Sequence, residues 1–315
     1  MRAARFHHYG GAEVIEIEEV AKPQPARREV LVRVAASSLN AGDIAGRQGK
    51  GRPVHAGKLP HIPGYDIAGV IEACGPGVTS FIPGEQVYAL TGLRAGGNAE
   101  YICLHQDKLG YAPASLDLVS AASVPLAGMT ALQGLYGRAS LRAGQRLLVI
   151  GAAGGVGSFA VQLGKIAGCH VTAVCRDHQV AEILALGADA TIDRTREDYS
   201  KLGERWDVIY DAAGHLDFAE ARRALGPAGI AVATRAYPTS MLAARLQPTG
   251  QRYSFVITQS RGHDLALLAR LIDAGQLRPL IDRVFPLDQI QAAHRYYEQG
   301  GIRGKVVVAV AHPLL

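Results

Sequence analysis

The first 115 or so residues carry short apolar runs separated by turn residues. Val30 to Ala35 and Ile67 to Ala73 are predicted strands, and further strands are expected at Gln86 to Leu90 and Glu100 to Leu104. Glycine and proline mark tight turns between and after these runs. They stand at Pro63-Gly64, Gly75-Pro76-Gly77 and Pro83-Gly84. Evenly spaced short strands with such turns predict a partly open β-barrel.

After Ser120 the pattern changes to helices that alternate with buried strands. Ala121 to Tyr136 is a predicted helix, and further helices are expected from about Gly157 to Ala167 and at Val180 to Leu186. The intervening apolar strands are Arg146–Ile150, His170–Cys175, Ala190–Ile192, Val208–Tyr210 and Ile230–Ala233. This alternation predicts an α/β domain with a doubly wound parallel sheet.

The end of the chain returns to the first pattern. A last helix at Asp264 to Ala274 precedes Val284-Phe285 and the apolar strand Lys305 to Val310. We therefore expect one domain to be formed by residues 1–118 and 262–315, and the α/β domain by residues 119–261. Two domains also suit 315 residues, because single cores rarely grow beyond about 250–300 residues.

Composition narrows the class of protein. The 37 glycines are about 12% of the 315 residues, compared with a usual share of about 7%. This excess predicts many tight turns or close backbone approaches. Four cysteines without a CxxC pair favour a reducing, cytoplasmic location. We expect no secretory signal and no membrane span. The net charge of +5 comes from scattered lysines and arginines, so nucleic-acid binding is not expected.

A glycine-rich loop joins a predicted strand to a predicted helix at residues 151–157. From Ala152 it is A-x-G-x-x-G, close to the dinucleotide fingerprint. Gly154 would let the backbone approach a pyrophosphate, and Gly157 would let the helix pack closely on the strand. The alternative is an ordinary turn, but the strand–loop–helix context favours a cofactor site. The predicted contacts are Ala153, Gly154, Gly155, Val156 and Gly157.

The end of the second strand of this domain bears on the choice between NAD and NADP. An acidic residue there binds the ribose 2′-hydroxyl, whereas arginine accommodates a 2′-phosphate. The strand ends at Cys175, Arg176 follows, and Arg194 follows the next strand. We predict NADPH, bound near Cys175, Arg176 and Arg194. Asp177 has the spacing expected for NAD, and the arginines could instead be solvated loop residues.

Several motifs, in order along nearly the whole chain, carry a family resemblance. They are Ser38–Asp43 (SLNAGD), Ile62–Gly69 (IPGYDIAG), Gly97–Tyr101 (GNAEY), Val124–Ala131 (VPLAGMTA), the AAGGVG loop, Leu186–Asp189 (LGAD), Asp207–Gly214 (DVIYDAAG) and Arg303–Lys305 (RGK). The chain resembles the zinc-independent branch of the medium-chain dehydrogenase/reductase superfamily, among quinone oxidoreductases similar to zeta-crystallin. Its closing stretch especially resembles the subgroup of reticulon-4-interacting protein.

The resemblance implies a GroES-like catalytic domain and a Rossmann domain, with NADPH and substrate in a cleft between them, and a homodimer. It also implies no catalytic metal. Zinc-dependent relatives carry Cys where Asn40 stands and His where Tyr65 stands, and asparagine and tyrosine are poor zinc ligands by comparison. The histidines, among them His7, His8, His55 and His61, show no ligand spacing.

The matching positions supply the predicted catalytic residues. Asn40 would donate a hydrogen bond to the substrate carbonyl, or its amide would only hold the loop before Asp43. Asp43 is expected to fix that loop through backbone hydrogen bonds. Relatives often carry a tyrosine where Ala45 stands, so Tyr65 is the candidate proton donor, with a packed tyrosine as the alternative.

The remaining predictions concern the cofactor and two further cations. Thr130 would lie beside the nicotinamide, although its hydroxyl could instead bond its own helix. Further cofactor contacts are expected from Gly214, Thr234, Phe255 and Val256. Arg47, in the same loop as Asn40 and Asp43, is expected to attract an anionic substrate group, and Lys305 is expected to be a surface or loop charge. Pocket shape would depend on the loops at 46–59 and 237–252.

The resemblance thus implies an NADPH-dependent enzyme that reduces quinones or α,β-unsaturated carbonyls by hydride transfer without a metal. Two alternatives stay open. One is an enoyl or ketone reductase of a single pathway. The other is a dinucleotide-binding protein with a non-catalytic role, sensory or RNA-binding.

Overall fold

A computed structural model describes residues 1–50, 59–235, 239–242 and 250–310. The chain divides into two compact units. Unit 1 contains Met1–Leu126, Gln259–Gly275 and Pro279–Leu315, and unit 2 contains Ala127–Thr258 and Gln276–Arg278. Residues 51–58, with His55, and much of the loop predicted at 237–252 lie outside the described residues.

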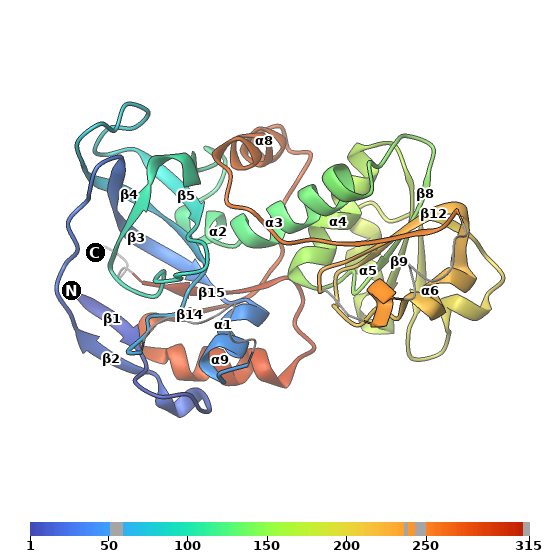
Figure 1. Cartoon of the computed structure of the whole chain (residues 1–315), viewed down its shortest axis with the longest axis horizontal. Helices are drawn as coiled ribbons and strands as arrows, with labels where there is room; N and C mark the ends of the chain where they lie inside the picture. The colour runs from blue at the N-terminus through green and yellow to red at the C-terminus, as the bar shows by residue number, and fades with distance from the viewer. Residues whose placement is uncertain (51–58, 236–238, 243–249, 311–315) are drawn as a thin grey trace. The chain divides into compact units, whose positions relative to one another are not determined.

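Unit 1 is built on a sheet whose main path is β14-β15-β3-β4-β5-β7, with β6 paired to β3 (Figure 1). All of its pairings are antiparallel except β14 with β15. The valines of β3 alternate inward and pack with Ile67, Ile71, Val306 and Val308 in one core. The bounds are β3 Glu29–Ser38, β4 Asp66–Cys74, β5 Gln86–Leu90, β6 Tyr101–His105, β7 Leu109–Tyr111, β14 Ile281–Pro286 and β15 Lys305–Ala309.

The remaining elements of unit 1 are a small ribbon and several helices. Strands β1 (Arg2–Arg5) and β2 (Glu16–Glu19) form a separate antiparallel pair. The helices are α1 (Ala41–Arg47), α2 (Leu118–Ala121), α8 (Gly262–Asp273) and α9 (Ile290–Gln299). Asn40 is the N-cap of α1 and lies two residues after the end of β3, so the loop singled out by sequence starts at the end of a central strand. The hydrophobic pattern of the sequence indicated neither α1 nor α9.

Unit 2 is the predicted doubly wound parallel sheet, which is confirmed. Its strand order is β10-β9-β8-β11-β12-β13, and every pairing is parallel. This is the order expected of a dinucleotide-binding domain. The strands are β8 Arg146–Ile150, β9 His170–Cys175, β10 Ala190–Asp193, β11 Trp206–Asp211, β12 Leu225–Ala233 and β13 Arg252–Phe255, and the helices include α4 Gly155–Ile166, α5 Val180–Ala185 and α6 Phe218–Ala224.

The single helix predicted over 121–136 is wrong in detail. The segment is divided into α2, α3 (Pro125–Leu132) and a π-helical stretch at Gln133–Arg138. Pro125 begins a helix well because its missing N–H would be unpaired there anyway. The Tyr210 hydroxyl donates to the Thr130 carbonyl oxygen at 2.9 Å, an oxygen that an α-helix would reserve for the Gly134 N–H. This side-chain intrusion accounts for the widened turn.

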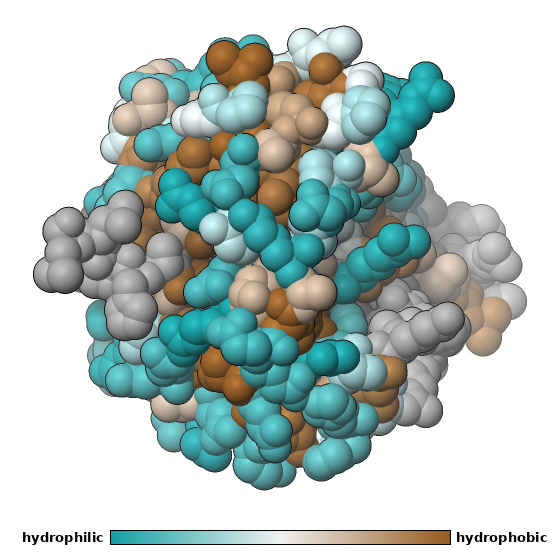
Figure 2. Space-filling view, turned by 90° about the vertical axis from the view of Figure 1, so that its left-hand side faces the viewer, coloured by the Kyte–Doolittle hydropathy of each residue, from teal (hydrophilic) through white to brown (hydrophobic). Residues whose placement is uncertain are grey.

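No helix within the described ranges is long and apolar enough to cross a membrane. Figure 2 shows one face of the molecule, on which hydrophilic residues surround scattered apolar ones. Isolated surface apolar residues of this kind are normal for folded proteins.

Candidate active site and cofactor site

The glycine loop of unit 2 leaves the end of β8 and runs into α4. Gly151 has φ +74°, a left-handed conformation that favours glycine. Gly154 stands at the N-cap of α4 without a side-chain cap. In the part of the chain that is described, the N–H groups of Gly155, Val156 and Gly157 have no hydrogen-bond partner. Unpaired N–H groups at a helix start attract anionic oxygens, so this loop fits a pyrophosphate.

Gly157 lies in the first turn of α4, where this helix packs against the backbone of the glycine loop. A Cβ added there would lie 2.7 Å from Ala152 Cα and closer still to the Gly151 carbonyl oxygen. The neighbouring Ala153 is buried. Gly154 differs, because its added Cβ would meet only Gly151 O at 3.5 Å. The fold thus requires glycine at 157, whereas at 154 the space is open to a ligand.

The ends of β9 and β10 bring the two predicted phosphate-binding arginines to neighbouring positions. Cys175 ends β9 and pairs in register with Asp193, and the Arg194 N–H donates to Cys175 O at 3.0 Å. Neither Arg176 nor Arg194 forms a salt bridge with any described residue, whereas Arg196 pairs with Asp193. Burial, with Asp193 and Asp177 nearby, raises the pKa of the Cys175 thiol, so it stays neutral. Two neighbouring guanidiniums that form no salt bridge with a described residue suit a phosphate.

Asp211 builds the next turn at this edge of the sheet, a role that the sequence reading did not assign to it. Its side chain is buried at the end of β11 and accepts four backbone N–H groups at 2.7–3.0 Å, from Ala213, Gly214, His215 and Leu216. Burial raises the carboxyl pKa, against the lowering effect of these bonds. Gly214 then has φ +70°. The DAAG motif could have indicated this role, because the side chain of an acidic residue three positions before a turn glycine can accept the backbone N–H groups of the turn.

Asp211→Ala is expected to weaken both folding and cofactor binding. It would leave four N–H groups without their acceptor, and each buried unsatisfied group costs about 1–3 kcal/mol. We expect the free energy of unfolding in urea to fall by at least about 2 kcal/mol. Exposed Glu197→Ala is the control, with no expected change. Equal unfolding midpoints for the two variants would contradict this role of Asp211.

The other predicted cofactor residues of unit 2 lie on α3 and at the ends of β12 and β13. Thr130 is buried, and its hydroxyl is 2.6 Å from that of Thr258, a residue that the sequence reading missed. The Thr234 N–H donates to Asp211 O, and the Val256 N–H donates to Ala233 O. Phe255 ends β13 and is half-buried.

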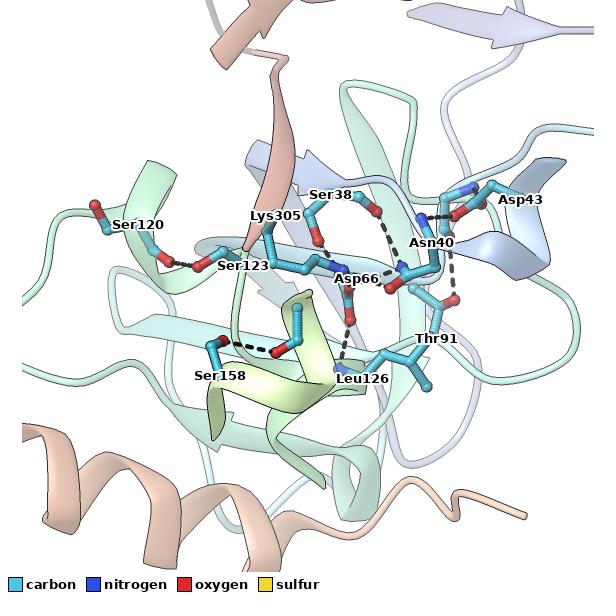
Figure 3. A network of polar contacts seen from close by, with 12 residues as sticks. Ser38, Asn40, Asp43, Asp66, Thr91, Ser120, Ser123, Leu126, Ser158 and Lys305 are labelled. Carbon is cyan, nitrogen blue, oxygen red and sulfur yellow. Dashed lines mark hydrogen bonds and ion pairs between the residues drawn. The ribbon is translucent and has the colours of Figure 1, made fainter. Parts of the chain in front are cut away.

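Unit 1 holds a buried polar cluster formed by Ser38, Asn40, Asp66 and Lys305, which we call the Asp66 cluster (Figure 3). The four residues come together because β3 pairs with both β4 and β15. Asp66 Oδ2 accepts from Ser38 Oγ at 2.7 Å, Asn40 Nδ2 at 2.9 Å and Lys305 Nζ at 3.2 Å. Asp66 Oδ1 accepts from the Leu126 N–H at 2.6 Å, at the start of α3.

Asn40 has no amide hydrogen left over in this arrangement. Its Nδ2 donates to Asp66 Oδ2 and to Ser38 O at 3.2 Å, and its Oδ1 accepts from Lys305 Nζ. An asparagine amide has two hydrogens, so both are engaged. Two roles were considered for Asn40: donating to the substrate carbonyl, and holding the loop before Asp43. The hydrogen bonds of its amide are those of a residue that holds the loop.

The structure corrects two expectations about cations. Lys305 is not a surface or loop charge, since its side chain is 4% exposed and bonds Asn40 and Asp66. Arg47 cannot attract substrate from solvent, because it is completely buried. Its guanidinium donates to Gly10 O and to Glu298 Oε1 on α9.

Asp43 ties the same loop together by two backbone bonds. Its Oδ2 accepts from the Asn40 N–H at 2.9 Å and its Oδ1 from the Gly64 N–H at 2.7 Å. These bonds are of the kind predicted for Asp43. Burial raises its pKa to about 7, while the two N–H groups act in the opposite direction.

The raised pKa predicts a pH dependence of stability. The folded state binds the Asp43 proton more tightly than the unfolded chain, so this contribution is present at low pH and is lost as pH rises through about 7. Between pH 4 and 7 the free energy of unfolding should fall by up to about 1.4 kcal/mol per unit. Asp43→Asn should flatten this slope in urea titrations, and exposed Asp107→Asn should keep it. An unchanged slope in Asp43→Asn would contradict the assignment.

Tyr65 lies beside this loop and is 8% exposed. Burial and the charge of Asp43 raise the pKa of its phenol, so it stays protonated at neutral pH. Tyr297, on α9, is similar, with its pKa raised to about 12 by burial and by Asp43. Tyr65 therefore keeps its proton, but as a weaker acid than an exposed tyrosine.

The donor set of unit 1 does not fit a catalytic zinc. The Asn40 oxygen already accepts from an ammonium group, which would repel a metal cation. Phenol and amide groups are also poor ligands compared with thiolate and imidazole. In the described ranges no group of three or more His, Cys, Asp and Glu side chains could hold a metal ion.

Comparisons with known proteins match both units. Residues 26–114 match the alcohol dehydrogenase GroES-like domain, and residues 186–308 match a family described as zinc-binding dehydrogenase. The chain is 35% identical to the NADPH-dependent alkenal/one oxidoreductase of Arabidopsis thaliana, over 98% of this chain and 79% of the relative. It is 34% identical to 2-methylene-furan-3-one reductase of Solanum lycopersicum, over 100% and 79%.

A solved structure agrees with these relatives. The quinone oxidoreductase of Coxiella burnetii superposes with a TM-score of 0.92 at 29% identity, covering 99% of each chain. The chain is also 31% identical to the mitochondrial NAD(P)H oxidoreductase RTN4IP1 of Danio rerio, over 90% of this chain and 84% of that one. The fold, the phosphate loop and these similarities lead to one conclusion: the chain belongs to the medium-chain dehydrogenase/reductase superfamily, in its quinone oxidoreductase branch.

Proposed function

We propose that this protein is an NADPH-dependent oxidoreductase that reduces quinones or α,β-unsaturated carbonyls. The observation that carries the proposal is the start of α4, which has no side-chain cap and where three adjacent N–H groups belong to a loop that needs glycine at positions 151 and 157. The substrate class is proposed from the relatives, whose names specify alkenal/one, furanone and quinone reduction.

NADPH, when bound, would supply a hydride. The residues of unit 2 would hold it: the N–H groups of 155–157 at the pyrophosphate, the Asp211 turn beside it, and Thr130 toward the nicotinamide. Arg176 and Arg194 would bind a 2′-phosphate, which is why we propose NADPH over NADH.

The residues of unit 1 would orient the substrate and stabilise charge. Reduction makes the carbonyl oxygen more negative, so a fixed donor aimed at that oxygen lowers the barrier. The Asp66 cluster is held by hydrogen bonds from three strands and a helix start, so it is preorganised. Asp43 fixes the loop that carries Asn40, and Tyr65 stays protonated beside it.

We also propose a homodimer in a reducing compartment such as the cytoplasm. Strand β13 is the last strand of the sheet in the described part of unit 2, so its outer edge can accept a second copy. The four cysteines are free thiols, as a reducing compartment would keep them. Sedimentation would test the dimer, and a monomer at micromolar concentration would contradict it.

The proposed function is tested by NADPH oxidation with a panel of quinones, 2-alkenals and enones. We expect turnover with at least one class and none with saturated ketones. Tight NADPH binding without turnover on the whole panel would contradict the reductase and favour a pathway-specific or non-catalytic role. RNA binding without NADPH affinity would overturn the cofactor assignment as well.

A further inference from the structure

Lys305 has more hydrogen-bond donors than the Asp66 cluster uses. Its ammonium carries three N–H groups. Two of them point at Asn40 Oδ1 and Asp66 Oδ2, and no third acceptor lies among the described residues. The side chain is 96% buried, since it is 4% exposed. A buried donor without an acceptor is costly, so the site is built to receive an oxygen from elsewhere.

The other members of the cluster cannot take that role. Both Asn40 amide hydrogens are engaged, and the Ser38 hydroxyl donates its hydrogen to Asp66. Asp66 offers acceptors, which would repel an oxygen that is becoming negative. The third N–H of Lys305 is therefore the donor that remains in the cluster.

The fixed geometry of Lys305 favours a donor role over a flexible surface charge. The residue begins β15, next to β3 in the sheet, and its backbone N–H donates to Leu280 O at 2.9 Å. Gly304 before it has φ +80° and an added Cβ would lie 2.6 Å from Leu280 C, so the backbone entering the site is rigidly placed. A preorganised cation needs no reorganisation when charge develops.

We propose that Lys305 donates its third N–H to the substrate carbonyl oxygen and stabilises the negative charge that forms there during reduction. This inference rests on the proposed function. In an enone, the hydride from NADPH forms a C–H bond at the β-carbon. The alkene π pair becomes a new π bond between the α-carbon and the carbonyl carbon, and the carbonyl π pair moves onto oxygen. A proton from solvent then reaches the α-carbon, which gives the saturated ketone and NADP⁺.

The test uses the double variant Asp66→Asn/Lys305→Met. Lys305→Met alone would leave a buried unpaired carboxylate, which is strongly destabilising, whereas the double variant is neutral at both positions. Lys22→Met is the control, because Lys22 is a lysine of unit 1 in an exposed pair with Glu72. Lys305→Arg keeps both the ion pair with Asp66 and a cation with N–H donors at position 305, so it separates the effect of the cation from that of the changed side chain.

The first readout is catalysis measured beside cofactor affinity. We expect kcat of the double variant to fall by about 10²-fold, as for the loss of one oxyanion donor, while the Kd for NADPH stays within about threefold. Lys305→Arg should keep more activity than the double variant. A weaker Kd for NADPH with unchanged kcat would mean that the oxygen belongs to a cofactor phosphate, and would overturn the proposal.

The second readout does not depend on turnover. p-Nitrophenol in the presence of NADP⁺ is a probe for an anionic oxygen, because its absorbance reports its ionisation. Wild type and Lys22→Met should bind the phenolate at least about tenfold more tightly than the double variant, as expected for one charge-assisted hydrogen bond. Equal affinities would overturn the role of Lys305 even if the enzyme is active. A wild type that is inert on every substrate would instead refute the proposed function, whatever the probe shows.

Discussion

Gly157→Ala is expected to weaken NADPH binding strongly, because the added Cβ has no room in the phosphate loop. The added Cβ would lie 2.7 Å from Ala152 Cα and 2.8 Å from Gly151 C, closer than real Cβ contacts come. These are backbone atoms of the loop itself, so relief requires the loop and the start of α4 to separate. We expect the Kd for NADPH to rise by at least about 10²-fold, together with a loss of about 1–3 kcal/mol in unfolding free energy from overpacking.

Two other glycines serve as matched controls for this prediction. Gly137→Ala should leave both quantities unchanged, because an added Cβ meets nothing within 4 Å. Gly154→Ala should fold normally but bind NADPH less tightly, since its Cβ would occupy space open to the ligand. Titration of NADPH fluorescence and urea unfolding measure the two effects. Wild-type affinity in Gly157→Ala would show that the pyrophosphate binds elsewhere.

The second large effect concerns the choice of cofactor. Replacing Arg176 and Arg194 together by alanine should raise the Kd for NADPH by about 10²-fold and leave that for NADH within about threefold. Hydrogen bonds to charged groups contribute about 1.5–3 kcal/mol each, so the loss of two is sufficient. Arg196→Ala is the control, because Arg196 already pairs with Asp193.

The alternative at this position is specific recognition of NADH by Asp177. If it holds, wild type binds NADH more tightly than NADPH, and Asp177→Asn removes that preference. In the structure Asp177 is exposed and follows the strand end by two residues. Parallel titrations of both cofactors against wild type and the two variants decide between the assignments.

Sequence reasoning succeeded best where burial produces continuous apolar runs. The bounds of β8 and β9 match the prediction residue for residue, because strands covered on both faces read as unbroken hydrophobic segments. The phosphate loop was recognisable because its glycine spacing is local. Helix α1 was not predicted, because a helix of seven residues is too short to show a clear hydrophobic period.

The Asp66 cluster could not be predicted from the sequence, because its members are far apart along the chain. Lys305 and Asn40 are 265 residues apart and meet only because β15 adds to the edge of β3. Arg47 and Glu298 are separated by 251 residues in the same way. Such pairings depend on long-range strand and helix docking, so a charge that looks solvated in the sequence can be buried. Which hydrogens of Asn40 are engaged likewise depends on those distant partners.

The central claim is hydride transfer from NADPH to an enone or quinone. Its most direct measurement uses NADPH deuterated at nicotinamide C4, on the face that the enzyme transfers, with a 2-alkenal substrate in ordinary water. We predict one deuterium at the β-carbon of the saturated product, hydrogen from water at the α-carbon, and one NADP⁺ per product. Saturated product without deuterium from either C4-labelled form of NADPH, or no product at all with any substrate of the panel, would contradict it.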